Sequence, residues 1–119
     1  MRSAAALIAL AAGAAVAAPA APGRYAGELC VATRPSAPPS CGAADVEVAA
    51  GAIVVRVADI AYRLVPRREQ LDVATMHGSM EIDEFSAAYL WEGTTLRFDD
   101  ADKHVRYEVR IGARKDAPR

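Results

Sequence analysis

Apolar and polar residues alternate with a period of two along most of the chain beyond residue 23, as expected for strands that bury one face. The alternation is clearest near the C-terminus, where polar residues separate Val105, Tyr107, Val109 and Ile111. The same pattern predicts strands in the segments 24–32, 46–48, 53–57, 60–64 and 94–98. Because Asp59 interrupts the pattern, 60–64 is either a separate strand or a bulged continuation of the strand before it.

The segment 67–77 fits two kinds of element, a strand or a short helix. The alternation of Leu71, Val73 and Thr75 is that of a strand, whereas a proline and a glycine flank the segment as they would flank a helix. Because β-branched side chains are enriched in strands, we favour the strand.

The alternation changes phase within the segment 80–91. Met80 and Ile82 share one phase. The other phase is shared by Phe85, Ala87, Tyr89 and Trp91. A slip of one residue turns every later side chain to the opposite face of the sheet unless an extra residue absorbs it. The sequence therefore predicts a β-bulge or a sharp bend at Asp83-Glu84.

Turn signals separate the predicted strands. Glycine accepts positive φ, which supports tight turns at Ala50-Gly51 and Glu92-Gly93, and the aspartates of 99–102 can bond the backbone of another turn. Seven or eight short strands joined in this way predict an all-β domain, either a small antiparallel barrel or a sandwich. We favour the barrel, because an open sheet leaves two edges available for aggregation.

The chain begins with an apolar segment of a different kind. Arg2 precedes an unbroken run of small and apolar residues that ends in Ala15-Val16-Ala17. A basic start, an apolar centre and small residues before a cut are typical of a secretory signal peptide. A transmembrane helix is the weaker interpretation, because the run is mostly alanine. We assign residues 1–18 to a signal peptide and favour cleavage after Ala17.

Export also determines the expected domain organisation and charge. We expect residues 19–23 to be a disordered Ala/Pro segment, 24–112 to form a single β domain, and 113–119 to be a polar tail without a membrane anchor. Loss of Arg2 with the signal takes the 14 Lys and Arg residues to 13 against 15 Asp and Glu, a formal net charge of −2. This charge argues against a nucleic-acid-binding protein, which needs a basic surface.

Cys30 and Cys41 are the two cysteines of the chain, and an even number of cysteines in an exported protein predicts a disulfide. Their spacing is too wide for a CxxC metal or redox pair. Three prolines lie between them, so we expect a stiff surface loop. A bridge around such a loop stabilises the fold by about 3 kcal/mol in the chain-entropy model.

Candidate metal ligands gather around the predicted bulge. Imidazole and carboxylate groups suit zinc and similar ions, and both types are supplied by His77, Glu81, Asp83, Glu84 and the distant His104. A Gly-Ser turn separates the first two, so they do not share a helical face. We interpret these side chains as solvated surface groups and expect no metal or other cofactor.

The same region offers little for acid/base or nucleophilic catalysis. Asp83 and Glu84 are neighbours in a strand and should point to opposite faces, so they are poorly placed to act at one bond. Ser79 lies near His77, and Ser86 lies near Asp83, but neither serine belongs to a GxSxG or SxxK motif. No glycine-rich phosphate loop is present. We therefore expect a protein that is not an enzyme.

The aromatic residues allow two interpretations. Tyr62, Phe85, Tyr89, Trp91 and Tyr107 form either the core of a small β domain or an exposed patch that binds a protein or glycan. The phase of the sequence does not choose between these arrangements.

The segment 85–96, FSAAYLWEGTTL, resembles the Ser-Gly-x-x-Tyr, aromatic, Lys-Gly, x-x-Leu pattern of bacterial periplasmic inhibitors of C-type lysozyme. Ala87 stands where that family has glycine, and Glu92 stands where it has lysine. The family is a small exported β-barrel with a disulfide, and its motif serine enters the lysozyme cleft. The resemblance implies this role for Ser86.

These observations predict an exported, non-enzymatic β domain that binds a protein or glycan of the bacterial cell envelope, in the periplasm or outside the cell. A periplasmic lysozyme inhibitor is the sharper alternative, and a small envelope hydrolase is a second. The binding residues are expected at the bulge and in the strand after it, at Asp83, Glu84, Ser86, Tyr89 and Trp91.

Overall fold

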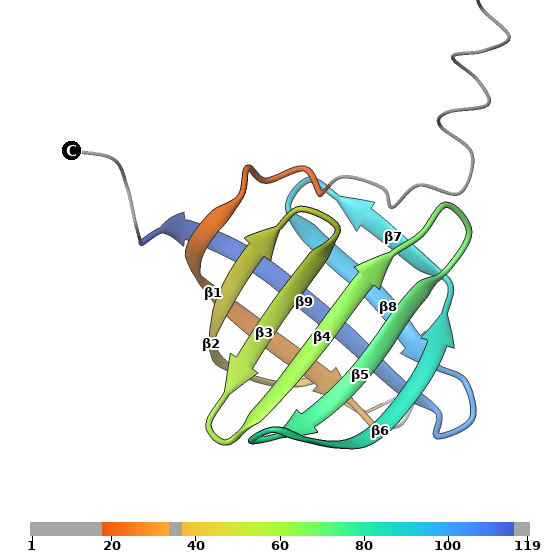
Figure 1. Cartoon of the computed structure of the whole chain (residues 1–119). Coiled ribbons are helices and arrows are strands. Elements are labelled where there is room, and N and C mark those ends of the chain that lie inside the picture. The colour runs from red at the N-terminus through yellow and green to blue at the C-terminus, as the bar shows by residue number, and fades with distance from the viewer. Residues whose placement is uncertain (1–17, 34–36, 116–119) are drawn as a thin grey trace, which may run out of the picture.

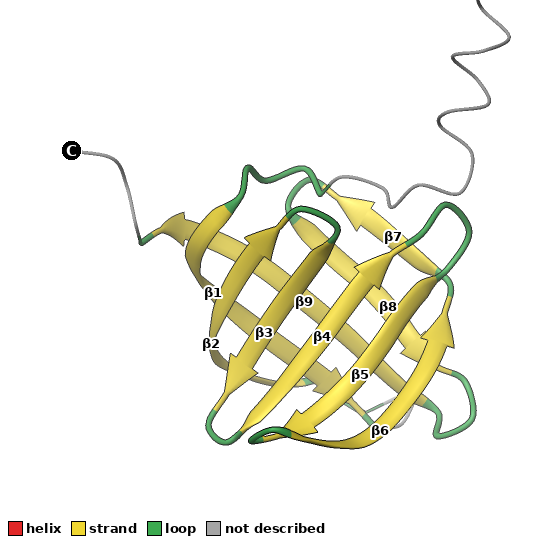
Figure 2. Cartoon of the chain, in the orientation of Figure 1, coloured by secondary structure: helices red, strands yellow, loops and turns green. Residues whose placement is uncertain are grey.

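The structure is a computed structural model that describes residues 18–33 and 37–115. The predicted signal peptide up to Ala17, part of the loop between the cysteines, and the last four residues of the predicted tail lie outside the described residues. The described residues form strands joined by short loops, as Figure 2 shows. None of them forms a helix long and apolar enough to span a membrane.

Nine antiparallel strands form one sheet that curls into a nearly closed barrel (Figure 1). The strands are β1 (Gly23–Ala32), β2 (Ser40–Ala49), β3 (Ala52–Val57), β4 (Ile60–Pro66), β5 (Leu71–His77), β6 (Met80–Ala87), β7 (Tyr89–Glu92), β8 (Thr95–Asp100) and β9 (Val105–Arg114). Their order in the sheet is β6-β5-β4-β3-β2-β1-β9-β8-β7. The all-β prediction is confirmed, and the segment 67–77 contributes a strand.

The ninth strand arises where the predicted strand 80–91 is interrupted. Ala88 separates β6 from β7, and these two strands lie at opposite edges of the sheet although they are consecutive in the chain. The chain thus crosses from one sheet edge to the other within a single residue. This crossing links the two edges covalently and brings the barrel close to closure.

The predicted β-bulge is present and involves Ile82. The pairing of β5 with β6 shifts between Thr75, opposite Asp83, and Met76, opposite Glu81, which leaves Ile82 without a partner. The bulge absorbs the change of phase, since Asp83, Phe85 and Ala87 all turn toward the interior side of the sheet. Met80 and Ile82 remain exposed, at 61% and 52%.

Two predicted turns lie slightly further along the chain. The expected Glu92-Gly93 turn is formed by Gly93-Thr94, because Glu92 still pairs with Thr95. The expected turn at 99–102 spans 101–104, because β8 continues through Asp100. The buried Asp100 carboxylate accepts a hydrogen bond from the backbone N–H of Lys103 at 3.3 Å and so stabilises the turn.

The core fills the inside of the barrel with the alternating apolar side chains of all nine strands. Residues that are nearly inaccessible to solvent include Val46, Ile53, Val55, Leu64, Leu71, Leu96 and Val109. The predicted alternation of buried and exposed positions is therefore observed in the strands that the sequence marked most clearly.

The Cys30–Cys41 disulfide joins β1 to β2, where the two residues are direct partners.

The segment 19–23, for which we expected disorder, is described and passes over one end of the barrel (Figure 1). Ala18 and Ala20 pack against the core, and the hydroxyl of Tyr25 donates a hydrogen bond to the carbonyl of Ala21 at 2.6 Å. Beside the same segment, where Arg114 donates a hydrogen bond to the carbonyl of Pro22 at 3.0 Å, β9 extends through Arg114 into the predicted tail.

Candidate functional site

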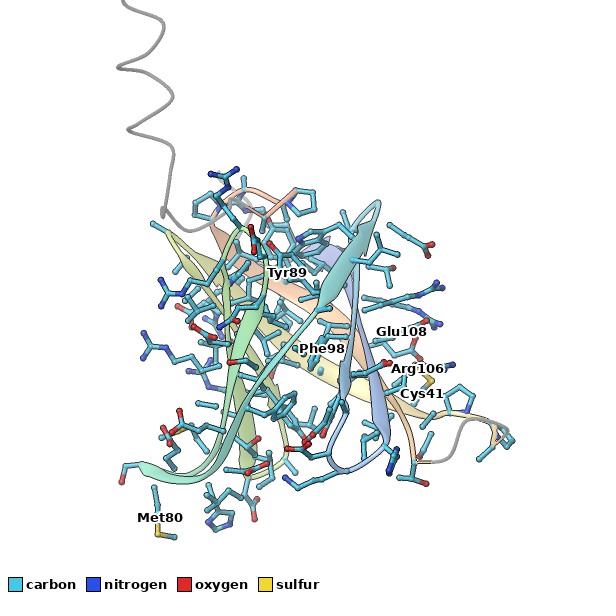
Figure 3. The ribbon with its side chains drawn as sticks, turned by 90° about the vertical axis from the view of Figure 1, so that its right-hand side faces the viewer. Cys41, Met80, Tyr89, Phe98, Arg106 and Glu108 are labelled. Atoms are coloured by element: carbon cyan, nitrogen blue, oxygen red, sulfur yellow. A yellow bond between two sulfur atoms is a disulfide. The ribbon has the colours of Figure 1, made fainter. Side chains whose placement is uncertain are left out.

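The two edges of the sheet meet along β6 and β8, and we call the gap between these strands the seam. β6 pairs with β5 on its other side, and β8 pairs with β9 throughout but with β7 only from Thr95 to Phe98. In Figure 3 the long strand formed by β6 and β7 crosses between the two layers of the barrel. The seam therefore opens where this strand leaves β8.

Side chains, rather than backbone hydrogen bonds, hold the two sides of the seam together. The carboxylate of Asp83 on β6 pairs with the ammonium of Lys103 in the turn after β8. The rings of Phe85 and Phe98 face each other across the seam, with their centroids 6.3 Å apart. Near the other end, the hydroxyl of Tyr89 donates a hydrogen bond to the carbonyl of Arg67.

A hollow of about 700 Å³ lies beside Ala88, where the chain passes from β6 into β7 and begins to pair with β8. We call it the seam hollow. It is lined by Ser86, Ala87, Ala88, Tyr89, Leu90, Arg97, Phe98, Asp99, Ala101, Arg106 and Glu108. Figure 3 shows Tyr89 and Phe98 between the layers, and Arg106 and Glu108 toward the outer side of β9. The volume of the seam hollow is within the range of about 300–1,000 Å³ that is usual for ligand pockets.

Ser86 lies at the edge of this hollow and belongs to a polar cluster. Its hydroxyl donates a hydrogen bond to the carboxylate of Asp72 at 3.0 Å, and it accepts one from the amide of Gln70 at 3.3 Å. The same amide donates to Asp72 at 2.8 Å, and the guanidinium of Arg67 donates to the other carboxylate oxygen at 3.0 Å. The hydrogen bond from Arg67, followed by that from Gln70, lowers the pKa of the Asp72 carboxyl, so the group remains ionised.

Charged side chains form a row across the outer faces of β7, β8, β9 and β1. Arg97 contacts Glu92 at 2.9 Å and Glu108 at 2.7 Å, and Arg110 contacts Glu108 at 2.8 Å and Glu28 at 2.7 Å. By contrast, Arg106 reaches its nearest carboxylate partner, Asp99, only at 3.8 Å. The wall of the seam hollow therefore carries two arginines and two carboxylates that balance in charge.

Asp83 and Glu84 point to different sides of β6, as we expected for neighbouring strand residues. Asp83 is half-buried at the seam, and the hydrogen bond from Lys103 lowers the pKa of its carboxyl. Glu84 is exposed on the outer face, where it lines a separate groove with Arg63 and Glu81. The two carboxylates are therefore not brought together.

The aromatic residues lie mainly inside the barrel. Tyr107 stacks on Phe98 with ring centroids 4.9 Å apart, and Tyr62 meets Tyr107 edge to face at 5.9 Å. Burial raises the pKa of both tyrosine hydroxyls. Trp91 also packs against the core, and its indole N–H is buried without a hydrogen-bond partner among the described residues. Of the predicted binding residues, Ser86 and Tyr89 share the seam hollow, and Trp91 does not line it.

The side chains considered as candidate metal ligands do not converge. His77 lies 3.7 Å from Asp59, in the neighbouring hairpin turn, and His104 is in the turn before β9. Among residues 18–33 and 37–115, three potential ligand atoms lie within 4.8 Å of one another only at Glu28, Cys30 and Cys41. The sulfur atoms of this group are joined in the disulfide, so they are not thiolate ligands.

The chain matches no protein-family model, no curated protein and no solved structure. The lysozyme-inhibitor hypothesis therefore depends on the residues of the segment 85–96 alone.

Sequence reasoning missed the residues that surround Ser86. Asp72 is its direct partner in the β5–β6 hairpin, and that pairing follows only when the two-residue turn at Gly78-Ser79 and the one-residue bulge are both counted. The bulge was predictable, so the pairing of Asp72 with Ser86 could have been predicted from the sequence. The presence of Arg97 and Arg106 in the wall of the seam hollow could not, because it depends on how β8 and β9 approach the strand that crosses between the sheet edges.

Proposed function

We propose that this protein is an exported, non-enzymatic binding domain of the bacterial cell envelope, and that its ligand occupies the seam hollow. The observation that carries the proposal is the combination of a hollow of ligand-binding size with an exposed apolar side chain at its wall, Leu90. Leu90 is 56% exposed, although it lies in the middle of a short strand. The Cys30–Cys41 disulfide supports the export part of the proposal, because such bonds persist in oxidising compartments.

We expect Leu90→Asp to abolish binding to envelope material, because it replaces the exposed apolar side chain in the wall of the hollow with a charged one. The matched control is Ile82→Asp, since Ile82 has a similar exposure of 52% but does not line the hollow. Binding is measured in two ways, by co-sedimentation of the purified protein with peptidoglycan and by photo-crosslinking to envelope proteins in cells from position 101, an exposed position in the wall of the hollow.

Retention of binding by Ile82→Asp and its loss in Leu90→Asp are the expected results. Equal binding by the two variants would place the ligand elsewhere. The absence of both sedimentation and crosslinking in the protein that keeps Leu90 and Ile82 would refute the proposal.

Inhibition of C-type lysozyme is the second candidate function, favoured by the exposed position of Ser86 beside the seam hollow. The purified protein should then slow lysis of bacterial cells by the enzyme. Replacement by alanine removes the hydroxyl that would enter the cleft of the enzyme, so Ser86→Ala should weaken this inhibition by about tenfold. Ser79→Ala, in the exposed turn at the far end of the hairpin, is the control. Unaltered lysis in the presence of the protein would exclude this function.

A further inference from the structure

One hydrogen bond shows which backbone groups of β8 face the seam. The N–H of Ile111 donates to the carbonyl of Thr94 at 3.1 Å, in the same register that continues through β8 and β9. Hydrogen-bonded pairs alternate with non-hydrogen-bonded pairs along an antiparallel ladder. Thr95, Arg97 and Asp99 therefore direct their backbone N–H and C=O groups away from β9, toward β7 and the seam.

The backbone of β6 also presents alternate residues to the seam. The N–H of Arg67 donates to the carbonyl of Gln70 at 2.8 Å, in the register of β4 and β5. Gln70 therefore directs its backbone groups toward β4, and the next residue, Leu71, directs its own toward β6. The partner of Leu71 on β6 is Ala87, so Ala87 directs its backbone groups toward β5. Ser86 therefore directs its N–H and C=O into the seam, and Ala88 continues the same alternation.

The ladder between β7 and β8 ends one rung before these groups could pair. Its last pair is Tyr89 with Phe98, and the next hydrogen-bonded rung would join Ala88 to Asp99. No backbone hydrogen bond joins Ala88 to Asp99 in the described structure. Both walls of the seam hollow thus carry backbone donors and acceptors, at the spacing of a strand, that β6 and β8 do not use with each other.

We propose that the seam hollow binds an extended polypeptide segment, which adds as a strand between β6 and β8. This inference rests on the proposed function and names the chemical class of the partner. In strand addition, backbone hydrogen bonds give affinity and pockets for alternate side chains give specificity. Ala87 is small, turns inward and lines the hollow together with Phe98, so we expect a guest side chain to occupy the hollow beside it.

The charges of the hollow favour a polypeptide over an acidic polymer. Arg97 and Arg106 are balanced by Asp99 and Glu108, and Arg97 already contacts two carboxylates. An acidic glycan would meet no net positive charge there. The N–H and C=O groups of a peptide, by contrast, can form hydrogen bonds with the backbone groups that β6 and β8 direct into the seam.

The test compares two substitutions of Asp99 that differ in one hydrogen-bond donor. Asp99→Pro removes the N–H that faces the seam, and proline is tolerated where a strand N–H faces outward from the ladder. Asp99→Ala is the matched control, because it loses the same side chain but keeps the N–H. A phage-displayed library of random linear peptides is selected on the unsubstituted protein, and the affinity of a selected synthetic peptide is measured for both variants.

We expect the peptide to bind Asp99→Pro about tenfold more weakly than it binds Asp99→Ala, because both variants lose the same side chain but only the proline leaves a buried acceptor of the guest without its donor. Amide hydrogen exchange of the unsubstituted protein provides a second measurement that needs no variant. Exchange at Asp99 and Ala88 should slow by about tenfold when the peptide binds.

Equal affinity for both variants, unaltered exchange at these amides, or failure to select any peptide would overturn the proposal. If peptidoglycan sediments the protein in a manner that depends on Leu90 while no peptide protects Asp99, the proposed function stands and strand addition is wrong. If neither ligand binds, both are wrong.

Discussion

The Phe98→Ala variant is expected to lose about 4 kcal/mol of unfolding free energy, within the range of large-to-small substitutions at buried aromatic residues. Phe98 is 3% exposed and contacts the rings of both Tyr107 and Phe85. Its loss leaves a cavity and also removes one of the few contacts that hold β6 against β8. Urea unfolding followed by tryptophan fluorescence measures the change.

Leu90→Ala is the control for this experiment, since Leu90 is 56% exposed and lies on the strand next to Phe98. Its substitution should change the unfolding free energy by less than about 0.5 kcal/mol. A loss below about 1 kcal/mol for Phe98→Ala would mean that the aromatic cluster does not support the seam.

Removal of the disulfide is expected to lower the unfolding free energy by about 3 kcal/mol in the Cys30→Ala/Cys41→Ala variant. The bond closes a short loop, with a sequence separation of 11, and so restricts the unfolded chain. Alanine is chosen because Cys30 is 2% exposed, where a serine hydroxyl would be buried. Urea unfolding of the variant is compared with that of the unsubstituted protein before and after reduction.

The reduced protein and the double variant should unfold at similar urea concentrations if the bond itself is responsible for the difference. A variant as stable as the oxidised protein would contradict the expected effect. A reduced protein far more stable than the variant would instead assign the loss to packing around Cys30.

The sequence predicted the fold where local pattern and tertiary environment agree. Val105 to Ile111 alternate and form β9, and Ile82 falls at the phase change that produces the bulge. The division at Ala88 was not predictable, because alternation continues without interruption from Phe85 to Trp91. The chain changes partner there, from β5 to β8, and a period-two pattern contains no information about which strand lies alongside.

The candidate site was predicted less completely, for the same physical reason. Ser86 and Tyr89 were identified and lie at the seam hollow, whereas Trp91 turns into the core. Its neighbour Leu90 is the exposed one, since alternate strand residues face opposite sides. Asp83 was considered as a ligand or an acid, but it pairs with Lys103 from a distant turn. Partners separated by 20 positions leave no local signal in the sequence.

The position of β1 between β2 and β9 has a consequence for how the barrel is completed. β2 to β6 each pair with the strand before them, so they can form as successive hairpins. β9 must instead find β1, and Glu28 and Arg110, which contact each other across these strands, are 82 positions apart. Loop-closure entropy makes such distant pairing slow. Until β9 arrives, β1 has an exposed edge that can pair with another molecule, so aggregation competes with folding until the last strand is in place.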